Sequence, residues 1–260
     1  MHRRTFAFLC ILSAAACGQS RPDSGAFDAL SATVWFQSAG EFRALCYQAY
    51  ALASLRLEAD LRDSVRQRPR AVVVDVDETV LDNSPHQAKL LRTGTSFPSW
   101  WREWVDMASA EAIPGAVEFL QDASAKGVEV YYVTNRSRDE RTATIANLAS
   151  RRFPHADEKH VLTREQESGK ERRRQSVGES HDIILLVGDN LADFAQVFER
   201  KPLDERNATV DRMREEFGRR FIVLPNTLYG DWESAVLRYE RNLTPERRHE
   251  LRMKSLRTFE

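Results

Sequence analysis

The sequence predicts an α/β fold built on a Rossmann-like, doubly wound and mostly parallel sheet, and three observations favour it. Short apolar runs typical of buried strands alternate with longer segments that have helical periodicity. Three of these runs end in polar residues, at Asp75, Thr134 and Asp189. The chain has 260 residues, 42% of them hydrophobic, which is enough to bury a sizeable core. We expect a small cap on this sheet and flanking helices from both termini.

The N-terminus has the pattern of an export signal over residues 1–17. His2-Arg3-Arg4 is positively charged, and the apolar stretch 6–16 is shorter than the ~20 residues that span a bilayer. Ala14-Ala15-Ala16 precedes Cys17, which favours lipid modification of Cys17 and leaves an ordinary cleavage site as the alternative. We therefore expect an exported bacterial protein, either an outer-membrane lipoprotein or periplasmic, with residues 18–29 as a tether.

Charge and cysteine content limit the partners. The formal net charge is -1, so we expect no nucleic acid polymer as partner and membrane contact only through a lipid anchor. Cys10 and Cys17 lie in the signal, so only Cys46 remains, which excludes an intrachain disulfide and predicts a buried thiol. The oligomeric state, monomer or homodimer, is left open.

We expect one domain over residues 30–260, with helices over 30–68 ahead of a catalytic core at 69–240. Pro69 separates the helices from the first strand, at 71–74. A cap insert at 84–113 contains an aromatic helix that begins near Ser99. Pro114 and Gly115 open the helix 116–125, because proline suits the first helical position.

The second half of the chain continues the alternation. We expect strands at 128–133, 161–162, 183–187 and 221–224. We expect helices at 139–151, 170–177, from 192 to at least 198, 232–239 and 245–257. Right-handed crossovers bring the carboxyl ends of such strands to one edge of the sheet, which is the predicted site.

Acidic residues gather at this edge. Asp75 and Asp77 follow the first strand, Asp189 follows another, and Asp193 lies one helical turn later. Converging carboxylates repel one another, and a divalent cation would relieve this; all-oxygen ligands suit Mg²⁺. A carboxylate nucleophile, a metal and a second carboxylate for proton transfer predict phosphoryl transfer through an aspartyl-phosphate on Asp75.

A hydroxyl and a positive charge for the phosphate oxygens complete such a site. Thr134 and Lys170 can supply them.

Four motifs in order carry a family resemblance: DVDET at 75–79, VTNR at 133–136, SGKERRR around Lys170, and GDNLADF at 188–194. They resemble the motifs of the haloacid dehalogenase (HAD) superfamily of phosphatases. More narrowly, VVVDVDETVLDN with ILLVGDNLADF is similar to the class C acid phosphatases, bacterial lipoprotein phosphatases. The resemblance spans roughly residues 30–237 and implies a Mg²⁺-dependent acid phosphatase.

The resemblance also implies residue roles. Asp75 is expected to be the nucleophile and a metal ligand. Asp77 is expected to act as general acid and then base, with its backbone carbonyl on the metal. Asp189 is expected to complete the metal site, and Asp193 to orient the ligands or hold a metal-bound water.

The phosphate and the rest of the substrate have their own expected residues. Thr134, the backbone of Asn135 and Lys170 would hold the phosphate. The family binds nucleoside 5′-monophosphates between aromatic rings, and the aligned positions here are Trp101 and Tyr229, with Trp232 nearby.

Alternatives stay open for the substrate. The tryptophans at 100, 101 and 104 also fit a purely structural role in packing the cap. Other small phosphate esters, or phosphate transfer to an alcohol, are the nearest rival to nucleotide hydrolysis. His86 stands where the family has tyrosine. A non-catalytic binding or storage protein on this fold is a further alternative, although Asp75 is present here.

Several polar residues are assigned structural roles. Glu78 is expected to support its loop by hydrogen bonding. The run Arg172–Arg174 is expected to be solvated, with one arginine turned inward. The histidines at 155, 160 and 181 show no metal-ligand spacing and are expected to lie at the surface or in packing.

Overall fold

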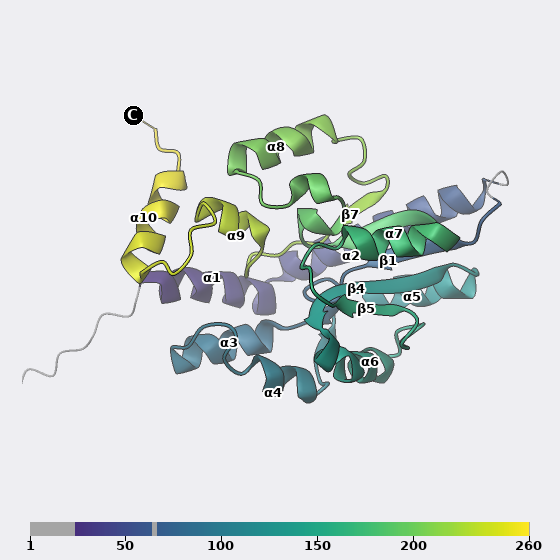
Figure 1. Cartoon of the computed structure of the whole chain (residues 1–260), viewed down its shortest axis with the longest axis horizontal. Coiled ribbons are helices and arrows are strands. Elements are labelled where there is room, and N and C mark those ends of the chain that lie inside the picture. The colour runs from purple at the N-terminus through teal and green to yellow at the C-terminus, as the bar shows by residue number, and fades with distance from the viewer. Residues whose placement is uncertain (1–23, 64–66, 260) are drawn as a thin grey trace, which may run out of the picture.

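A five-stranded, all-parallel sheet forms the centre of the molecule (Figure 1). The computed structural model describes residues 24–63 and 67–259. In spatial order the strands are β5 (Val161–Arg164), β4 (Glu129–Ser137), β1 (Arg70–Val74), β6 (Asp182–Gly188) and β7 (Phe221–Val223). Every pairing between neighbours is parallel. The predicted fold class is confirmed.

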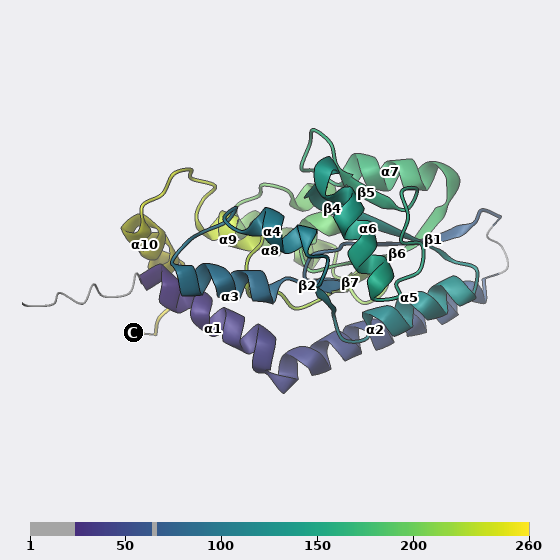
Figure 2. The same cartoon turned by 90° about the horizontal axis from the view of Figure 1, so that it is seen from below.

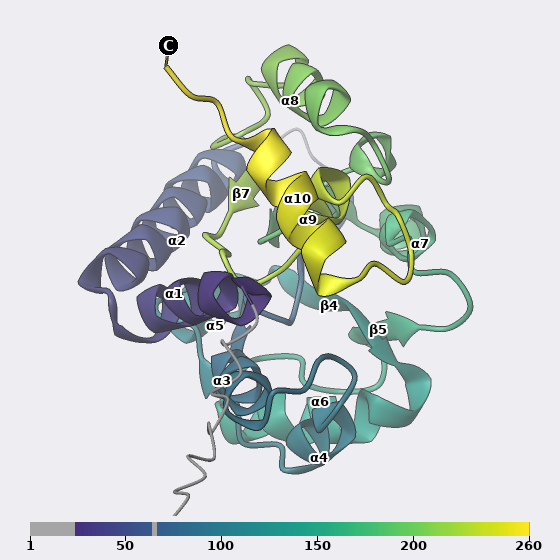
Figure 3. The same ribbon diagram turned by 90° about the vertical axis from the view of Figure 1, so that its left-hand side faces the viewer.

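Both faces of the sheet are buried, because helices cover each of them. Val72 and Val74 of β1 point into a large core with α2 (Gly40–Leu61) and α5 (Ala116–Ala125). The intervening Ala71 and Val73 point to the other face, against α7 (Glu171–Ser180). Figure 3 shows α2 and α7 on opposite sides of the sheet. An apolar strand without polar alternation is what burial on both faces requires.

The remaining helices complete these layers. Helix α6 (Arg141–Ser150) buries Leu148 in the larger core. Cys46 of α2 is fully buried in the same core, as predicted. Helix α8 (Leu203–Arg212) lies between β6 and β7 in the chain and was not predicted.

The cap follows β1 and lies at the carboxyl edge of the sheet. It contains α3 (Ser84–Thr93) and α4 (Trp101–Asp106), and an antiparallel pair of short strands, β2 (Leu81–Asp82) and β3 (Glu111–Ala112), closes its base. Helix α1 (Ser24–Ser38) runs along α3 (Figure 2), and Gln37 donates a hydrogen bond to Ser84 at 3.1 Å.

The two ends of the described chain meet beside this edge. Helices α9 (Asp231–Val236) and α10 (Pro245–Ser255) pack together near α1 (Figure 1), and Arg252 of α10 pairs with Glu233 of α9 at 2.6 Å. In the same view α3 and α4 lie on one side of the edge, and α9 and α10 on the other.

Three sequence expectations need correction. Helix α1 includes residues 24–29, which had been assigned to the tether from their composition. Strand β4 continues past Val133 to Ser137, because Ser137 pairs with Arg164 of β5.

The helix expected from residue 192 is absent. The described chain has two 3₁₀ turns there, Leu191–Asp193 and Gln196–Phe198. Asn190 and Asp193 bond each other's backbone in a capping box, and such local side-chain bonds compete with a longer helix.

Among the described helices, none combines the length and the apolar character needed to cross a membrane. The signal segment and Cys17 lie outside the described residues.

Candidate active site

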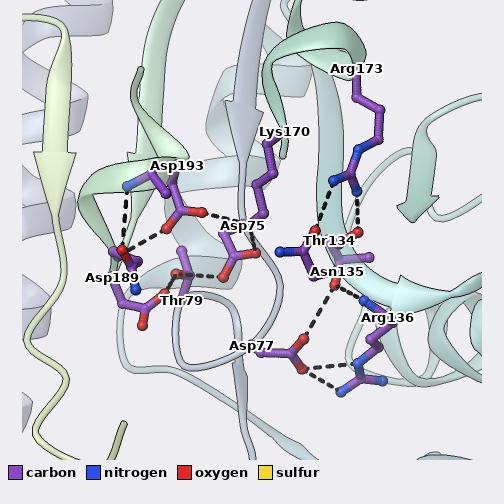
Figure 4. A network of polar contacts seen from close by, with 12 residues as sticks. Asp75, Asp77, Thr79, Thr134, Asn135, Arg136, Lys170, Arg173, Asp189 and Asp193 are labelled. Carbon is purple, nitrogen blue, oxygen red and sulfur yellow. Dashed lines mark hydrogen bonds and ion pairs between the residues drawn. The ribbon is translucent and has the colours of Figure 1, made fainter. Parts of the chain in front are cut away.

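The predicted residues converge at the carboxyl edge of the sheet because β1 lies between β4 and β6. Figure 4 shows Asp75 at the end of β1, Thr134 on β4, and Asp189 and Asp193 after β6, with Lys170 reaching in from the start of α7. Asp75 is 7% exposed, and Thr134 and Lys170 are also buried. Residues at the carboxyl ends of the predicted strands therefore meet in space.

A tight turn after β1 separates the two carboxylates of the first motif. Glu78 adopts a left-handed backbone conformation (φ 60°), and Leu81 donates its backbone N–H to Val76 O at 2.9 Å. The buried Glu78 carboxylate accepts the backbone N–H of Asn83 at 2.9 Å, which confirms its predicted support of the loop. Burial raises the pKa of Glu78 well above its ordinary value. The turn directs Asp75 and Asp77 to different partners.

Asp75, Asp189 and Asp193 form a compact acidic group. One oxygen from each lies within 4.8 Å of the others. The Thr79 hydroxyl lies 3.3 Å from Asp75 Oδ2 and 3.1 Å from Asp189 Oδ1. The amide of Asn226 donates to Asp189 Oδ2 at 2.7 Å. Asp193 was expected to orient the metal ligands or hold a metal-bound water, and its carboxylate lies within this group.

Electrostatics at this group favour a bound cation. Burial raises the pKa of Asp75 well above its ordinary value, although Lys170 acts to lower it. Burial and the neighbouring Asp193 raise the pKa of Asp189 to about 6. Three ionised carboxylates beside a single ammonium would leave an excess of two negative charges, which a divalent cation would balance. The oxygen-only donor set fits a hard cation such as Mg²⁺ or Ca²⁺.

Lys170 lies between two of these carboxylates. Its ammonium is ion-paired with Asp75 and, at 2.6 Å, with Asp193. Burial lowers the pKa of Lys170, but the carboxylates of Asp193 and Asp75 outweigh this effect and raise it above its ordinary value. The ammonium is therefore a fixed positive charge beside Asp75.

Close packing at the end of β6 requires glycine. A Cβ on Gly188 would lie 2.5 Å from both Cβ and Oδ2 of Asp193. Asp193 can therefore fold back over the strand only because residue 188 has no side chain.

Asp77 lies apart from the acidic group and faces Arg136. Arg136 Nε donates to Asp77 Oδ1 at 2.9 Å, and the Asn83 amide donates to the same oxygen at 2.9 Å. The Thr134 hydroxyl donates to Asp77 Oδ2 at 3.2 Å. Sequence reasoning did not assign a role to Arg136, which is only 3% exposed, although its place in the VTNR motif was the available signal.

Two arginines of α7 reach neighbouring segments of the site. Arg173 contacts Thr134 O and donates to Asn135 Oδ1 at 2.8 Å. Arg174 donates to Ala192 O at 2.9 Å and to Asp193 O at 2.8 Å. The expectation of a single inward arginine was wrong, because Arg173 reaches β4 and the adjacent Arg174 reaches the 3₁₀ turn after β6. The side chain of Arg172 is 82% exposed.

The predicted substrate aromatics lie on both sides of the edge. Trp101 on α4 packs against His86 (5.2 Å between ring centroids) and Phe97 (5.8 Å). Tyr229 and Trp232 belong to the loop before α9 and to α9 itself, across the edge from α4 (Figures 1 and 3). Within the described chain they make no ring contact with Trp101. The fully buried His86 bonds Ser99 O at 2.9 Å, so it belongs to the packing of the cap.

Comparison with known sequences gives partial matches to acid phosphatases. The chain is 30% identical over 129 residues to acid phosphatase 1 of Solanum lycopersicum, which covers 46% of this chain and 50% of that protein. It is 26% identical over 155 residues to the class B acid phosphatase of Xenorhabdus bovienii (strain SS-2004), covering 55% of this chain and 63% of that one. The matches thus span about half to two thirds of these relatives.

Solved structures extend the similarity to most of the chain. The class C acid phosphatase from Bacillus anthracis has 41% sequence identity and a TM-score of 0.87, covering 90% of this chain and 99% of that one. The same enzyme with tungstate bound gives 42% and 0.88, with the same coverage. The model of the family described as HAD superfamily, subfamily IIIB (acid phosphatase) matches residues 22–232. The chain belongs to this acid phosphatase family, as the four motifs predicted.

Proposed function

We propose that this protein hydrolyses small phosphomonoesters by transferring the phosphoryl group to Asp75. The observation that carries the proposal is the buried Asp75 carboxylate at the end of β1, beside Lys170 and the acidic group of Asp189 and Asp193. Further support comes from the Bacillus anthracis relative, which was solved with tungstate, a tetrahedral oxyanion like phosphate.

We propose Mg²⁺ as the cofactor. Asp75, Asp189 and Asp193 would hold it through side-chain oxygens or intervening waters, and Asp77 through its backbone carbonyl. When bound, the ion supplies positive charge for the non-bridging oxygens of the phosphate.

The protein's own residues then account for each step. Thr134, Asn135 and Lys170 bind the phosphate oxygens. A carboxylate oxygen of Asp75 attacks phosphorus while the ester P–O bond breaks, and Asp77 donates a proton to the leaving oxygen. In the second step Asp77 takes a proton from water, the water oxygen attacks phosphorus, and the bond to Asp75 breaks to release phosphate.

Nucleoside 5′-monophosphates are the proposed substrate class. The position of Trp101 on one side of the edge, and of Tyr229 and Trp232 on the other, supports a base held between aromatic rings. Stacking of this kind contributes ~1–3 kcal/mol per base. Other phosphate esters and phosphate transfer to an alcohol remain the alternative. Export with a lipid on Cys17 stays a prediction from the sequence.

The test combines one variant with a substrate panel. Asp75→Asn keeps the shape of the side chain and removes the nucleophile, so turnover should fall by several orders of magnitude while the melting profile stays cooperative. A variant as active as the parent would refute the covalent mechanism. Equal kcat/KM for nucleoside monophosphates and sugar phosphates in the parent would refute the nucleotide preference alone.

A further inference from the structure

The cap touches the catalytic edge through two tryptophans on one face of α4. Trp101 and Trp104 are three residues apart, so their side chains lie on the same side of the helix. The Trp104 indole N–H donates to Asn83 Oδ1 at 2.8 Å. The Arg136 guanidinium carbon lies 5.4 Å from the centroid of the Trp101 ring. Each tryptophan therefore rests on a residue that binds Asp77.

Asn83 uses every polar group of its side chain in this network. Its Oδ1 accepts from Trp104 and also from Arg136 NH2 at 3.2 Å, while its Nδ2 donates to Asp77 Oδ1 at 2.9 Å. Asn83 is completely buried, so water cannot replace a lost partner without entering the core. The two donors to Oδ1 fix the orientation of the amide. The Nδ2 group therefore points toward Asp77 and can donate to it.

The two oxygens of Asp77 are consequently in different environments. Oδ1 accepts from Asn83 Nδ2 and from Arg136, all through N–H donors. Among the described residues, Oδ2 has one hydrogen-bond partner, the hydroxyl of Thr134, which lies on the side of the predicted phosphate site. Oδ2 is thus the oxygen that stays available to a substrate.

We propose that Asn83 and Trp104 are positioning residues, which hold Asp77 so that Oδ2 faces the leaving oxygen of the ester. This inference rests on the proposed role of Asp77 as proton donor. It gives the cap a function in the first chemical step that is separate from binding the organic part of the substrate. Loss of either residue should allow the carboxyl to rotate while the nucleophile Asp75 stays in place.

The test uses two esters that differ in their need for a proton. Glycerol phosphate releases an alkoxide that must be protonated, whereas p-nitrophenyl phosphate releases a stable phenolate. Trp104→Phe keeps an aromatic ring and removes the N–H donor, so kcat/KM should fall about tenfold for glycerol phosphate and less than twofold for p-nitrophenyl phosphate. Asn83→Ala should lower it 10- to 100-fold with the same selectivity.

The neighbouring tryptophan supplies a matched control. Trp100 is 38% exposed and its ring contacts Lys89 rather than Asn83. Trp100→Phe should change kcat/KM by less than about twofold for either ester. Equal losses on both esters in Trp104→Phe and Asn83→Ala would overturn the proposal, because damage to the fold does not distinguish leaving groups. Unchanged kinetics in both variants would overturn it as well.

Asp77→Asn separates this inference from the mechanism beneath it. If Asp77→Asn loses glycerol phosphate hydrolysis selectively while Trp104→Phe and Asn83→Ala do not, only the positioning role is refuted. If Asp77→Asn lowers kcat/KM equally for both esters, Asp77 is not the proton donor of the first step and the proposed mechanism fails first. The comparison uses kcat/KM rather than kcat, because loss of the base in the second step would slow turnover of both esters.

Discussion

Removing Arg174 should cost far more stability than removing the adjacent Arg172. Arg174 is 4% exposed and donates to Ala192 O and Asp193 O, at 2.9 and 2.8 Å. Hydrogen bonds from a charged donor contribute about 1.5–3 kcal/mol each, so loss of these two bonds in Arg174→Ala should lower the free energy of unfolding by about 3–6 kcal/mol. The Arg172 side chain is 82% exposed, and its guanidinium NH2 lies 3.5 Å from Glu167 Oε1. Arg172→Ala should therefore lower the free energy of unfolding by less than about 1 kcal/mol.

Urea unfolding followed by circular dichroism measures both values, provided that the slope against denaturant is unchanged. A loss of about 3–6 kcal/mol is a large part of the ~5–15 kcal/mol that stabilises a typical domain. Because Arg174 holds the backbone of Asp193, the affinity for divalent cations should fall in Arg174→Ala and not in Arg172→Ala. If the free energies of unfolding of the two variants differ by less than about 1 kcal/mol, the buried hydrogen bonds of Arg174 contribute less than the value given above.

Three further predictions concern charge, packing and metal. Lys159 and its neighbours hold the pKa of Glu129 at about 2, below its ordinary 4.5, so this carboxylate stabilises the native state above pH 4.5 and loses the effect as pH falls toward 2. Glu129→Gln should therefore lower the free energy of unfolding by about 1–2 kcal/mol at pH 7 and by almost nothing near pH 2. Unfolding measured at each pH tests this, and an equal loss at both pH values would contradict it. Gly188→Ala should displace Asp193, with a cost of about 1–3 kcal/mol in unfolding and weaker cation binding in calorimetry; parent-like binding would refute the packing argument. Mg²⁺ added to metal-free protein should raise the melting temperature in the parent and not in Asp189→Asn; an equal rise in both would exclude Asp189 from the cation site.

Sequence alone predicted the sheet and the acidic edge because both depend on local patterns. An apolar run followed by Asp75 or Asp189 marks the end of a buried strand wherever it occurs in the chain. Right-handed crossovers between parallel strands bring their carboxyl ends to one edge of the sheet, so residues far apart in the chain could be assigned to one site.

The arginines could not be predicted in the same way. Arg136, Arg173 and Arg174 contact segments remote in sequence, and an arginine in a polar run has the same local pattern whether it is buried or solvated. The turn at Leu191–Asp193 was missed because side-chain bonds between Asn190 and Asp193 replaced the expected helix. These failures arise where tertiary or side-chain contacts outweigh backbone propensity.

The position of β1 in the middle of the sheet also determines when the site can form during synthesis. Lys170 lies 95 residues after Asp75, and Asp189 lies 110 residues after its partner Thr79. A nascent chain that ends before β6 has emerged can pair β1 with β4, but the other edge of β1 stays open and Asp75 lacks the neighbouring carboxylates of Asp189 and Asp193. Enzymatic activity should therefore require a chain that contains residues through Asp193, and should report the pairing of β6 with β1.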